Sequence, residues 1–173
     1  MKRRALLSLL GVAPVAALTG ACAAAPSALA VQATGTGDLG VVVERARGTL
    51  ALVNTSKRTL LGEIGGLGDL SHASVVFSRD GGTAYVFGRD GALSKVNLLT
   101  QRVEARLQQA GNSIGGAISQ DGTLVAAQNY TPGGIKVFDA QTLALVADIP
   151  ALYDPIGAPG KLSRVVGLAD LPA

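Results

Sequence analysis

Short apolar runs alternate with small groups of polar residues and glycine along most of the chain after about residue 37. Within each run, apolar and polar positions alternate over five or six residues, a spacing typical of β-strands. Glycine turns follow several of the runs, at Gly48, Gly91 and Gly133-Gly134. Such turns join antiparallel strands into hairpins, and the glycines interrupt any helical period. The pattern therefore predicts an all-β domain.

The runs recur in the same order, so that each can be assigned to a position in a repeating unit. The first runs of the three units are residues 40–45, 83–89 and 123–128. The second runs are 50–54, 93–97 and 135–139, and the third runs are 60–64, 103–107 and 143–147. The second run ends at Asn54, Asn97 and Asp139, which are 43 and 42 residues apart. A fourth run occupies residues 74–81 and 115–122, each ending in Asp-Gly. Four short strands per repeat of about forty residues are typical of a β-propeller blade.

The repeat also sets an expected extent for the domain. Residues 163–168 have the pattern of the innermost strand of a further blade, with Leu171-Pro172-Ala173 where its closing turn is expected. About three blades do not close a ring, because propellers typically have four to eight. We therefore expect residues 31–173 to be the N-terminal part of a longer propeller, truncated within the next blade. An open array completed by another chain is the alternative, and its unpaired strand edges disfavour it.

Composition and charge exclude some functions. The chain has 173 residues, of which 48% are hydrophobic and 16% charged, as in a globular domain. Its net charge of +3 lies at the N-terminus, where Lys2, Arg3 and Arg4 precede the first acidic residue, Asp38. The remaining 12 Lys and Arg are balanced by 12 Asp and Glu. A nucleic-acid-binding surface is therefore not expected.

Residues 1–30 have the pattern of a signal peptide, which predicts export to the periplasm. The basic residues at positions 2–4 precede an apolar run over 5–18, which is too short to span a bilayer comfortably. Because Arg3-Arg4 also fits a twin-arginine signal, the export route stays open.

Cys22 is the sole cysteine, and the residues before it resemble a lipobox, in which a lipidated cysteine follows small residues. Thr19 occupies the position that is usually leucine, and cleavage within 28–30 would remove Cys22 with the leader. Lipid anchoring to a membrane and loss of Cys22 both stay open. Because the mature body has no cysteine pair, neither a disulfide framework nor a thiolate metal site is expected there, and because Cys-x-x-Cys-His is lacking, covalently attached haem c is not expected either.

His72 is the sole histidine, and it precedes a predicted innermost strand, where a blade approaches the central channel. The repeat aligns His72 with Ser113 and Arg164, and such divergence at a channel mouth suggests a ligand site. Arg45 and Arg89 are aligned before glycine turns, and arginine binds carboxylates through two parallel hydrogen bonds. The alternatives are a hydrogen-bonded loop histidine and two solvated turn arginines.

Two further residues could assist such a site. Asp69 could orient His72 from three positions away, although Gly-Asp is also common in turns. Tyr130 could stack on a flat ligand or cover a blade edge.

The segments Gly66–Gly81, Tyr85–Gly91 and Gly111–Gly122 resemble the NirF family of haem d1 biosynthesis proteins. The resemblance extends from about Gly37 to the end of the chain. A more distant similarity connects it to the haem d1 domain of cytochrome cd1 nitrite reductase, an eight-bladed propeller. The resemblance implies eight blades in the complete ring. It also implies a periplasmic protein that binds haem d1 or a late precursor and acts in a late step of its maturation.

The resemblance assigns roles to individual residues. His72 falls at the position of the haem iron ligand and is the tentative catalytic residue, while Arg45 and Arg89 fall where arginines meet the carboxylates of the macrocycle. The repeat adds Ser113 and Arg164 to this cofactor-binding set. Other haem d1 assembly proteins or nitrite reductase are the implied partners.

Two questions about the activity stay open at this point. The first is whether the protein modifies the tetrapyrrole or only holds it. This chain lacks the cytochrome c domain of the reductase, so we do not expect it to reduce nitrite by itself. The second is whether it is instead a non-catalytic envelope propeller that binds a protein or cell-surface partner.

Overall fold

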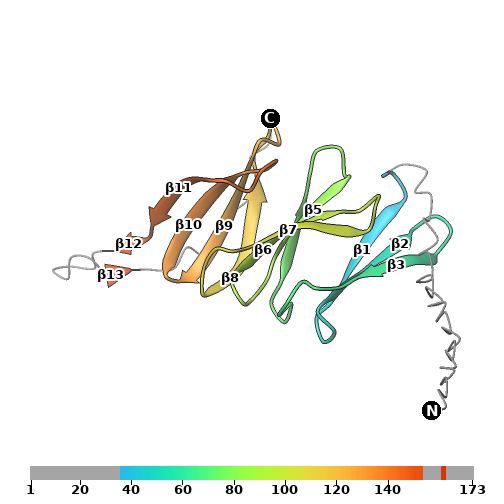
Figure 1. Ribbon diagram of the computed structural model, residues 1–173, viewed down its shortest axis with the longest axis horizontal. Helices are drawn as coiled ribbons and strands as arrows, with labels where there is room; N and C mark the ends of the chain where they lie inside the picture. Colours follow the sequence, from blue (N-terminus) through green and yellow to red (C-terminus); the bar gives the residue numbers. More distant parts are fainter. Residues whose placement is uncertain (1–35, 154–160, 163–173) are drawn as a thin grey trace, which may run out of the picture.

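The computed structural model describes residues 36–153 and 161–162, and within these ranges the regular structure is entirely β (Figure 1). The strands are β1 (Leu39–Glu44), β2 (Thr49–Asn54), β3 (Thr59–Ile64), β4 (Ser74–Phe77), β5 (Thr83–Phe87), β6 (Ala92–Asn97), β7 (Arg102–Gln108), β8 (Asn112–Ile118), β9 (Leu124–Thr131), β10 (Gly133–Asp139), β11 (Leu145–Pro150), β12 (Leu152–Tyr153) and β13 (Lys161–Leu162). The predicted signal peptide with Cys22, the predicted strand at 163–168 and Arg164 lie outside the described residues.

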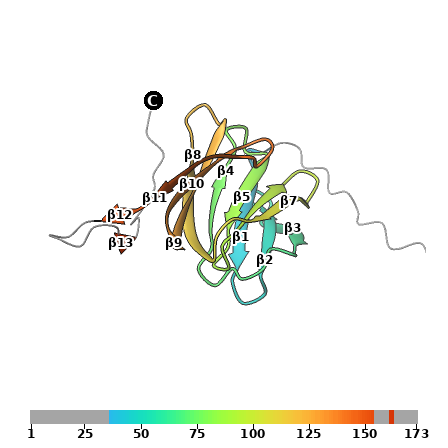
Figure 2. The same cartoon turned by 60° about the vertical axis from the view of Figure 1, so that its left-hand side comes forward.

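The strands form successive antiparallel sheets in which neighbours in sequence are neighbours in space. Blade 1 consists of β1–β3, blade 2 of β4–β7 and blade 3 of β8–β11, and a short pair, β12–β13, follows. Figure 1 shows the blades in a row along the long axis, and the turned view in Figure 2 shows them one behind another. The innermost strands of blades 2 and 3, β4 and β8, are in contact. This arrangement confirms the predicted propeller blades.

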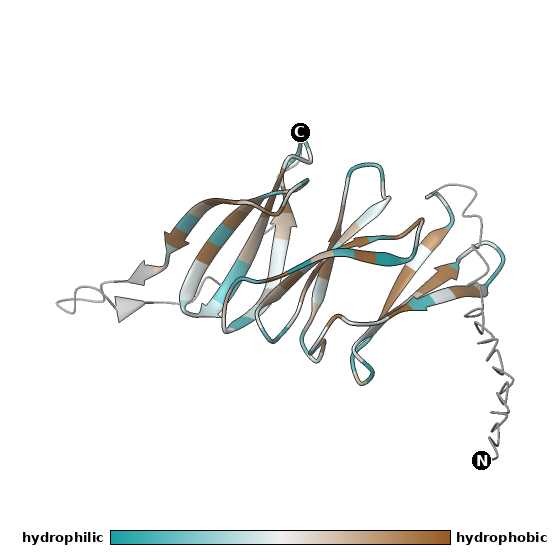
Figure 3. Cartoon of the chain, in the orientation of Figure 1, coloured by the Kyte–Doolittle hydropathy of each residue, from teal (hydrophilic) through white to brown (hydrophobic). Residues whose placement is uncertain are grey.

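The core lies between the blades. One cluster, including Leu52, Leu70 and Val86, fills the space between blades 1 and 2. A second, including Phe87 and Phe138, fills the space between blades 2 and 3. Figure 3 shows the hydrophobic residues distributed along the strands of all three blades. Each blade thus buries its apolar positions against its neighbour, as the alternation in the sequence predicts.

The turns explain why Asn and Asp recur at the ends of the second runs. The side-chain oxygens of Asn54, Asn97 and Asp139 accept hydrogen bonds from the backbone N–H three residues later, at 2.7, 2.9 and 2.7 Å. These bonds replace the strand pairing that is lost where the chain turns. All three turns also contain a left-handed residue four positions after the Asn or Asp: Arg58, Gln101 and Leu143 have φ angles of 54°, 56° and 58°. In blade 3, β11 begins at Leu145, two residues after the predicted start of the run.

The Asp-Gly turns between the first two strands of blades 2 and 3 share one geometry. Ser78 Oγ donates to Asp80 Oδ1 at 2.5 Å, and Ser119 Oγ donates to Asp121 Oδ1 at 2.6 Å. Hydrogen bonds from Ser119, and then from Thr123, lower the pKa of Asp121 to about 2. The Asp80 carboxyl also has a lowered pKa, mainly because of Ser78. Both carboxylates therefore stay ionised and keep their turns closed near neutral pH.

Hydrogen bonds from side chains to backbone carbonyls hold blade 2 against blade 3. Tyr85 Oη donates to Ala140 O at 2.9 Å, and Lys95 Nζ donates to Gln141 O at 2.8 Å. Arg79 Nη2 donates to Ser119 O at 2.7 Å. These bonds fix the relative position of the two blades, and so of the loops at their ends.

Candidate functional site

Three loops meet at one end of blades 1 and 2, and they carry Arg45, His72 and Arg89, three of the five residues predicted to bind a ligand. They are the β1–β2 turn (45–48), the β3–β4 loop (65–73) and the β5–β6 turn (88–91), and we call them together the His72 rim. The backbone N–H of Arg89 donates to Asp69 O at 2.8 Å, which joins the β5–β6 turn to the loop that carries His72. The β1–β2 turn touches the same loop, because a Cβ added to Gly48 would lie 2.6 Å from Gly68 O.

Glycines make this close approach geometrically feasible. Gly48 and Gly68 have φ angles of 65° and 76°, in the left-handed region that favours glycine. A Cβ on Gly68 would collide with the Asp90 carboxylate, and one on Gly88 would lie 2.5 Å from the other oxygen of that carboxylate. Gly48 and Gly68 therefore meet backbone to backbone, and Gly68 and Gly88 pack on the Asp90 carboxylate. The side chains of Arg45, His72 and Arg89 are exposed.

The charges of Arg89 and His72, two of the predicted ligand-binding residues, act on the Asp69 carboxylate. Its pKa is lowered mainly by hydrogen bonding from Ser71, whose N–H donates to Asp69 Oδ1 at 2.8 Å, and further by the charges of Arg89 and His72. The direct contact in this group is the hydrogen bond from the Arg89 N–H to Asp69 O, and the suggested orientation of His72 by Asp69 stays a prediction.

Ser113, which the repeat aligned with His72, occupies a different environment. It is fully buried in β8, and its Oγ donates to Gln128 O at 2.8 Å. Strand β8 begins at Asn112 and has register irregularities on both sides of Ser113, so this position lies within a sheet. The ligand-binding roles of Arg45, His72, Arg89, Ser113 and Arg164 stay predictions.

An ion pair that was not predicted from the sequence lies beneath the rim. Arg106 Nη2 lies 2.5 Å from Asp90 Oδ2, and the same oxygen accepts from the Asp69 N–H at 3.5 Å. The sequence could have revealed this ion pair, because two equivalent positions hold oppositely charged residues in both repeats, with the two charges exchanged. In blade 1, Arg47 pairs with Glu63, and each of these residues lies 43 positions before Asp90 and Arg106, respectively.

Further buried polar groups lie at the same end of blade 3. The side-chain amides of Gln109 and Asn129 form two hydrogen bonds of 2.8 Å with each other, and Lys136 Nζ donates to Gln109 O at 2.7 Å. Tyr130 is half-buried directly after this pair. Ser74 Oγ, at the start of β4, is a buried atom without a hydrogen-bond partner.

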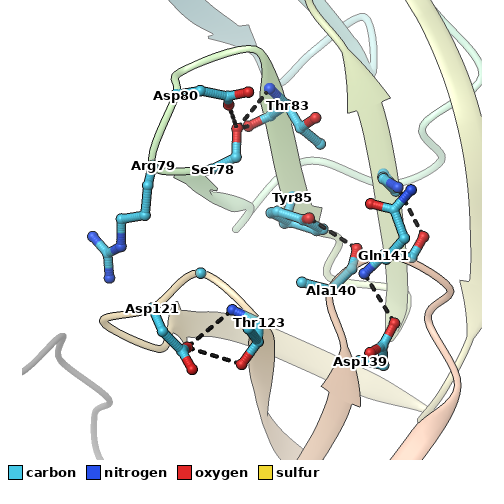
Figure 4. A pocket seen from close by; sticks show the side chains of 12 residues that line it. Ser78, Arg79, Asp80, Thr83, Tyr85, Asp121, Thr123, Asp139, Ala140 and Gln141 are labelled. Atoms are coloured by element: carbon cyan, nitrogen blue, oxygen red, sulfur yellow. Dashed lines mark hydrogen bonds between the residues drawn. The ribbon is translucent and has the colours of Figure 1, made fainter.

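A cavity of about 450 Å³ lies between blades 2 and 3 at the opposite end from the His72 rim. The two Asp-Gly turns and the turn after β10 line it. Figure 4 shows the Asp121 carboxylate bonded to Thr123 of its own turn and Tyr85 reaching Ala140. Because these polar groups are used within the fold, the cavity is a weaker candidate for a ligand site than the rim.

Two kinds of feature are absent from the part of the chain that the structure describes. Among residues 36–153 and 161–162, no group of three or more His, Cys, Asp and Glu could hold a metal ion. In the same ranges, no helix is long and apolar enough to cross a membrane.

Comparisons with known proteins connect this fold to tetrapyrrole proteins. Residues 34–173 match the family described as the cytochrome D1 heme domain. The proteins NirF of Stutzerimonas stutzeri and Pseudomonas aeruginosa are 64% and 61% identical over 138 residues, or 80% of this chain. The chain spans 35% of the length of each relative.

A solved structure, "Dihydro-heme d1 dehydrogenase NirN in complex with DHE", superposes with a TM-score of 0.69 at 30% identity. The match covers 78% of this chain and 28% of that protein.

Proposed function

Because the chain belongs to the cytochrome D1 haem domain family, we propose that it is part of a haem d1 biosynthesis protein that holds haem d1 or a late precursor at the His72 rim. The high identity to NirF proteins supports the pathway, and the NirN structure, which is a complex with DHE, supports the class of ligand. One observation carries the location. The Arg89 N–H to Asp69 O bond places the sole histidine and an exposed arginine on adjoining loops.

The residues of the rim fit a tetrapyrrole with an iron centre and carboxylate side chains. His72 is exposed, and its imidazole would hold the iron. Arg45 and Arg89 are exposed and would bind the carboxylates of the macrocycle. The bound haem d1 would supply the iron and conjugated ring, while the chain supplies binding and orientation.

Asp69 has a separate role in this proposal. Its carboxylate is ionised near neutral pH, and its pKa is lowered first by hydrogen bonds from Ser71 and then by the charges of Arg89 and His72. A fixed negative charge there favours one orientation of the His72 loop and of the Arg89 side chain. Asp69 therefore orders the two ligand-binding groups before the ligand arrives.

His72→Ala is expected to change the absorption spectrum of bound haem d1 in the complete protein while much of the affinity remains. The variant would lack the imidazole that is proposed to hold the iron, whereas the proposed contacts of Arg45 and Arg89 to the macrocycle would persist. The measurement is a titration with haem d1 followed by visible absorption. An unchanged spectrum would make His72 a structural loop residue.

Arg45→Ala and Arg89→Ala are each expected to weaken haem d1 binding by about 1.5–3 kcal/mol, the range for hydrogen bonds to charged groups. Their spectra should change less than that of His72→Ala. Arg102→Ala is the control, since Arg102 is exposed at the other end of blade 2. If neither rim variant binds more weakly than the control, the arginines are solvated turn residues.

The alternative function is a non-catalytic envelope propeller that binds a protein or cell-surface partner. Its exposed rim loops would serve a macromolecular ligand equally well. The absence of any Soret shift on mixing the complete protein with haem d1 would favour it.

We further propose that the protein acts in the periplasm, where other haem d1 assembly proteins or nitrite reductase would receive the cofactor. The pattern of residues 1–30 supports export. If Cys22 carries a lipid, Cys22→Ala is expected to move the protein from the membrane fraction to the soluble periplasmic fraction. Wild-type protein already found in the soluble fraction would instead favour cleavage near Ala30.

A further inference from the structure

We propose that Asp90 is a positioning residue that holds the β3–β4 loop, and with it His72, against the turn that carries Arg89. The inference rests on the proposed function of the His72 rim. Asp90 itself touches no proposed ligand group and acts through the loop.

The contacts of Asp90 connect three separate segments. Oδ1 accepts from the Ala92 N–H at 3.2 Å and so closes its own turn. Oδ2 accepts from Arg106 Nη2 at 2.5 Å and from the Asp69 N–H at 3.5 Å. Gln108 Nε2 donates to the Asp90 backbone carbonyl. The carboxylate therefore ties the β3–β4 loop to both the β5–β6 turn and strand β7.

The loop is shaped around this carboxylate. Gly68 and Gly88 lie so close to Asp90 that a Cβ on either would collide with its oxygens. The Asp90 and Arg106 side chains are only 29% and 32% exposed, so water screens their attraction less than at an open surface. The Asp90 carboxylate, enclosed by Gly68 and Gly88 and paired with Arg106, therefore resists displacement. The β3–β4 loop that covers it is held in place as well.

Blade 1 contains an equivalent ion pair with its charges exchanged. The comparison shows which contacts of Asp90 are common to both blades and which one belongs to blade 2. Arg47 in the β1–β2 turn pairs with Glu63 in β3 at 2.6 Å, at positions equivalent to Asp90 and Arg106. The pair from the turn to the outer strand is thus a feature of both blades. In blade 2 an acceptor stands in the turn, and only an acceptor can bind the Asp69 N–H.

The test compares Asp90→Asn with Glu63→Gln in the complete protein. Both changes remove one carboxylate charge from equivalent ion pairs, but only the first weakens a contact to the His72 loop. We expect Asp90→Asn to shift the spectrum of bound haem d1 in the same direction as His72→Ala, and Glu63→Gln to leave it unchanged. Adding Asp90→Asn to His72→Ala should cause no further shift, because Asp90 acts through His72.

A second measurement needs no ligand. The backbone amides of Asp69, Ser71 and Ala73 are hydrogen-bonded within the rim. Their hydrogen exchange should be about tenfold faster in Asp90→Asn, and faster still in Asp90→Ala, because a charge-assisted bond is lost. Exchange in β9 should match the wild type, which shows that the variants are folded.

The outcomes separate the two proposals. An unchanged spectrum in His72→Ala would contradict the role of His72, whereas the exchange measurement would still test the contact made by Asp90. A shifted spectrum in His72→Ala, with wild-type spectrum and exchange in Asp90→Asn, would overturn the positioning role alone. Equal spectral shifts in Asp90→Asn and Glu63→Gln would also overturn it.

Discussion

Replacing Gly68 with alanine is expected to shift the absorption spectrum of haem d1 bound to the complete protein toward that of the His72→Ala variant, with much of the affinity retained, because the loop that carries His72 is displaced. Gly68 has a φ angle of 76°, and an added Cβ would collide with Asp90 and lie 2.5 Å from Arg106 Nη2. The β3–β4 loop must then move away from the β5–β6 turn and carry His72 with it. A titration with haem d1 followed by visible absorption measures the shift.

Gly66→Ala provides the matched control for this change. Gly66 lies in the same loop with a φ angle of 80°, but an added Cβ meets nothing within 4 Å. Both variants therefore carry the strain of a left-handed alanine, about 1–2 kcal/mol, and only one carries the collision. Equal spectra of bound haem d1 in the two variants would show that the packing beneath the His72 rim does not position His72.

Phe87→Ala is expected to lower the free energy of unfolding by about 3–5 kcal/mol, the usual cost of removing a buried phenylalanine. Its ring is fully buried between blades 2 and 3 and packs so closely on Gly116 that an added Cβ there would collide with the ring. The loss is a large fraction of the stability of a typical domain. Denaturant unfolding of the complete protein, followed by circular dichroism, measures it.

Phe77→Ala is the control for the core, because Phe77 is 41% exposed at the end of β4. Its removal should cost much less than that of Phe87. A comparable loss in both variants would mean that side chains outside the interface between blades 2 and 3 stabilise the fold as strongly.

Much of the fold could be predicted from the sequence because each blade repeats local chemistry. Asn54, Asn97 and Asp139 close equivalent turns with the same side-chain to backbone bond. The start of β11 was predicted two residues early, since the apolar residue Leu143 continues the pattern although it belongs to the turn. Alternation locates strands well, but it does not show where turn geometry displaces one end.

The candidate site could be predicted only in part. Its residues are brought together by the packing of loops from different blades, which an alignment of the repeats does not show. The sequence drew attention to Arg45, His72 and Arg89, and the structure places their loops at one rim. The same alignment paired His72 with Ser113, which irregular strand pairing places in a buried position. The Asp90 pair was missed because its charges are exchanged between blades.

The bonds between blades 2 and 3 have a consequence for how such a protein can change during evolution. Tyr85, Lys95 and Arg79 all donate to backbone carbonyls of blade 3. Every amino acid, proline included, presents the same carbonyl. Substitutions at the accepting positions therefore preserve the acceptor, and adjacent repeats can diverge in sequence without coordinated changes. Duplicated repeats could in this way acquire unlike loops, one carrying a histidine and the next none, while their mutual alignment is inherited unchanged.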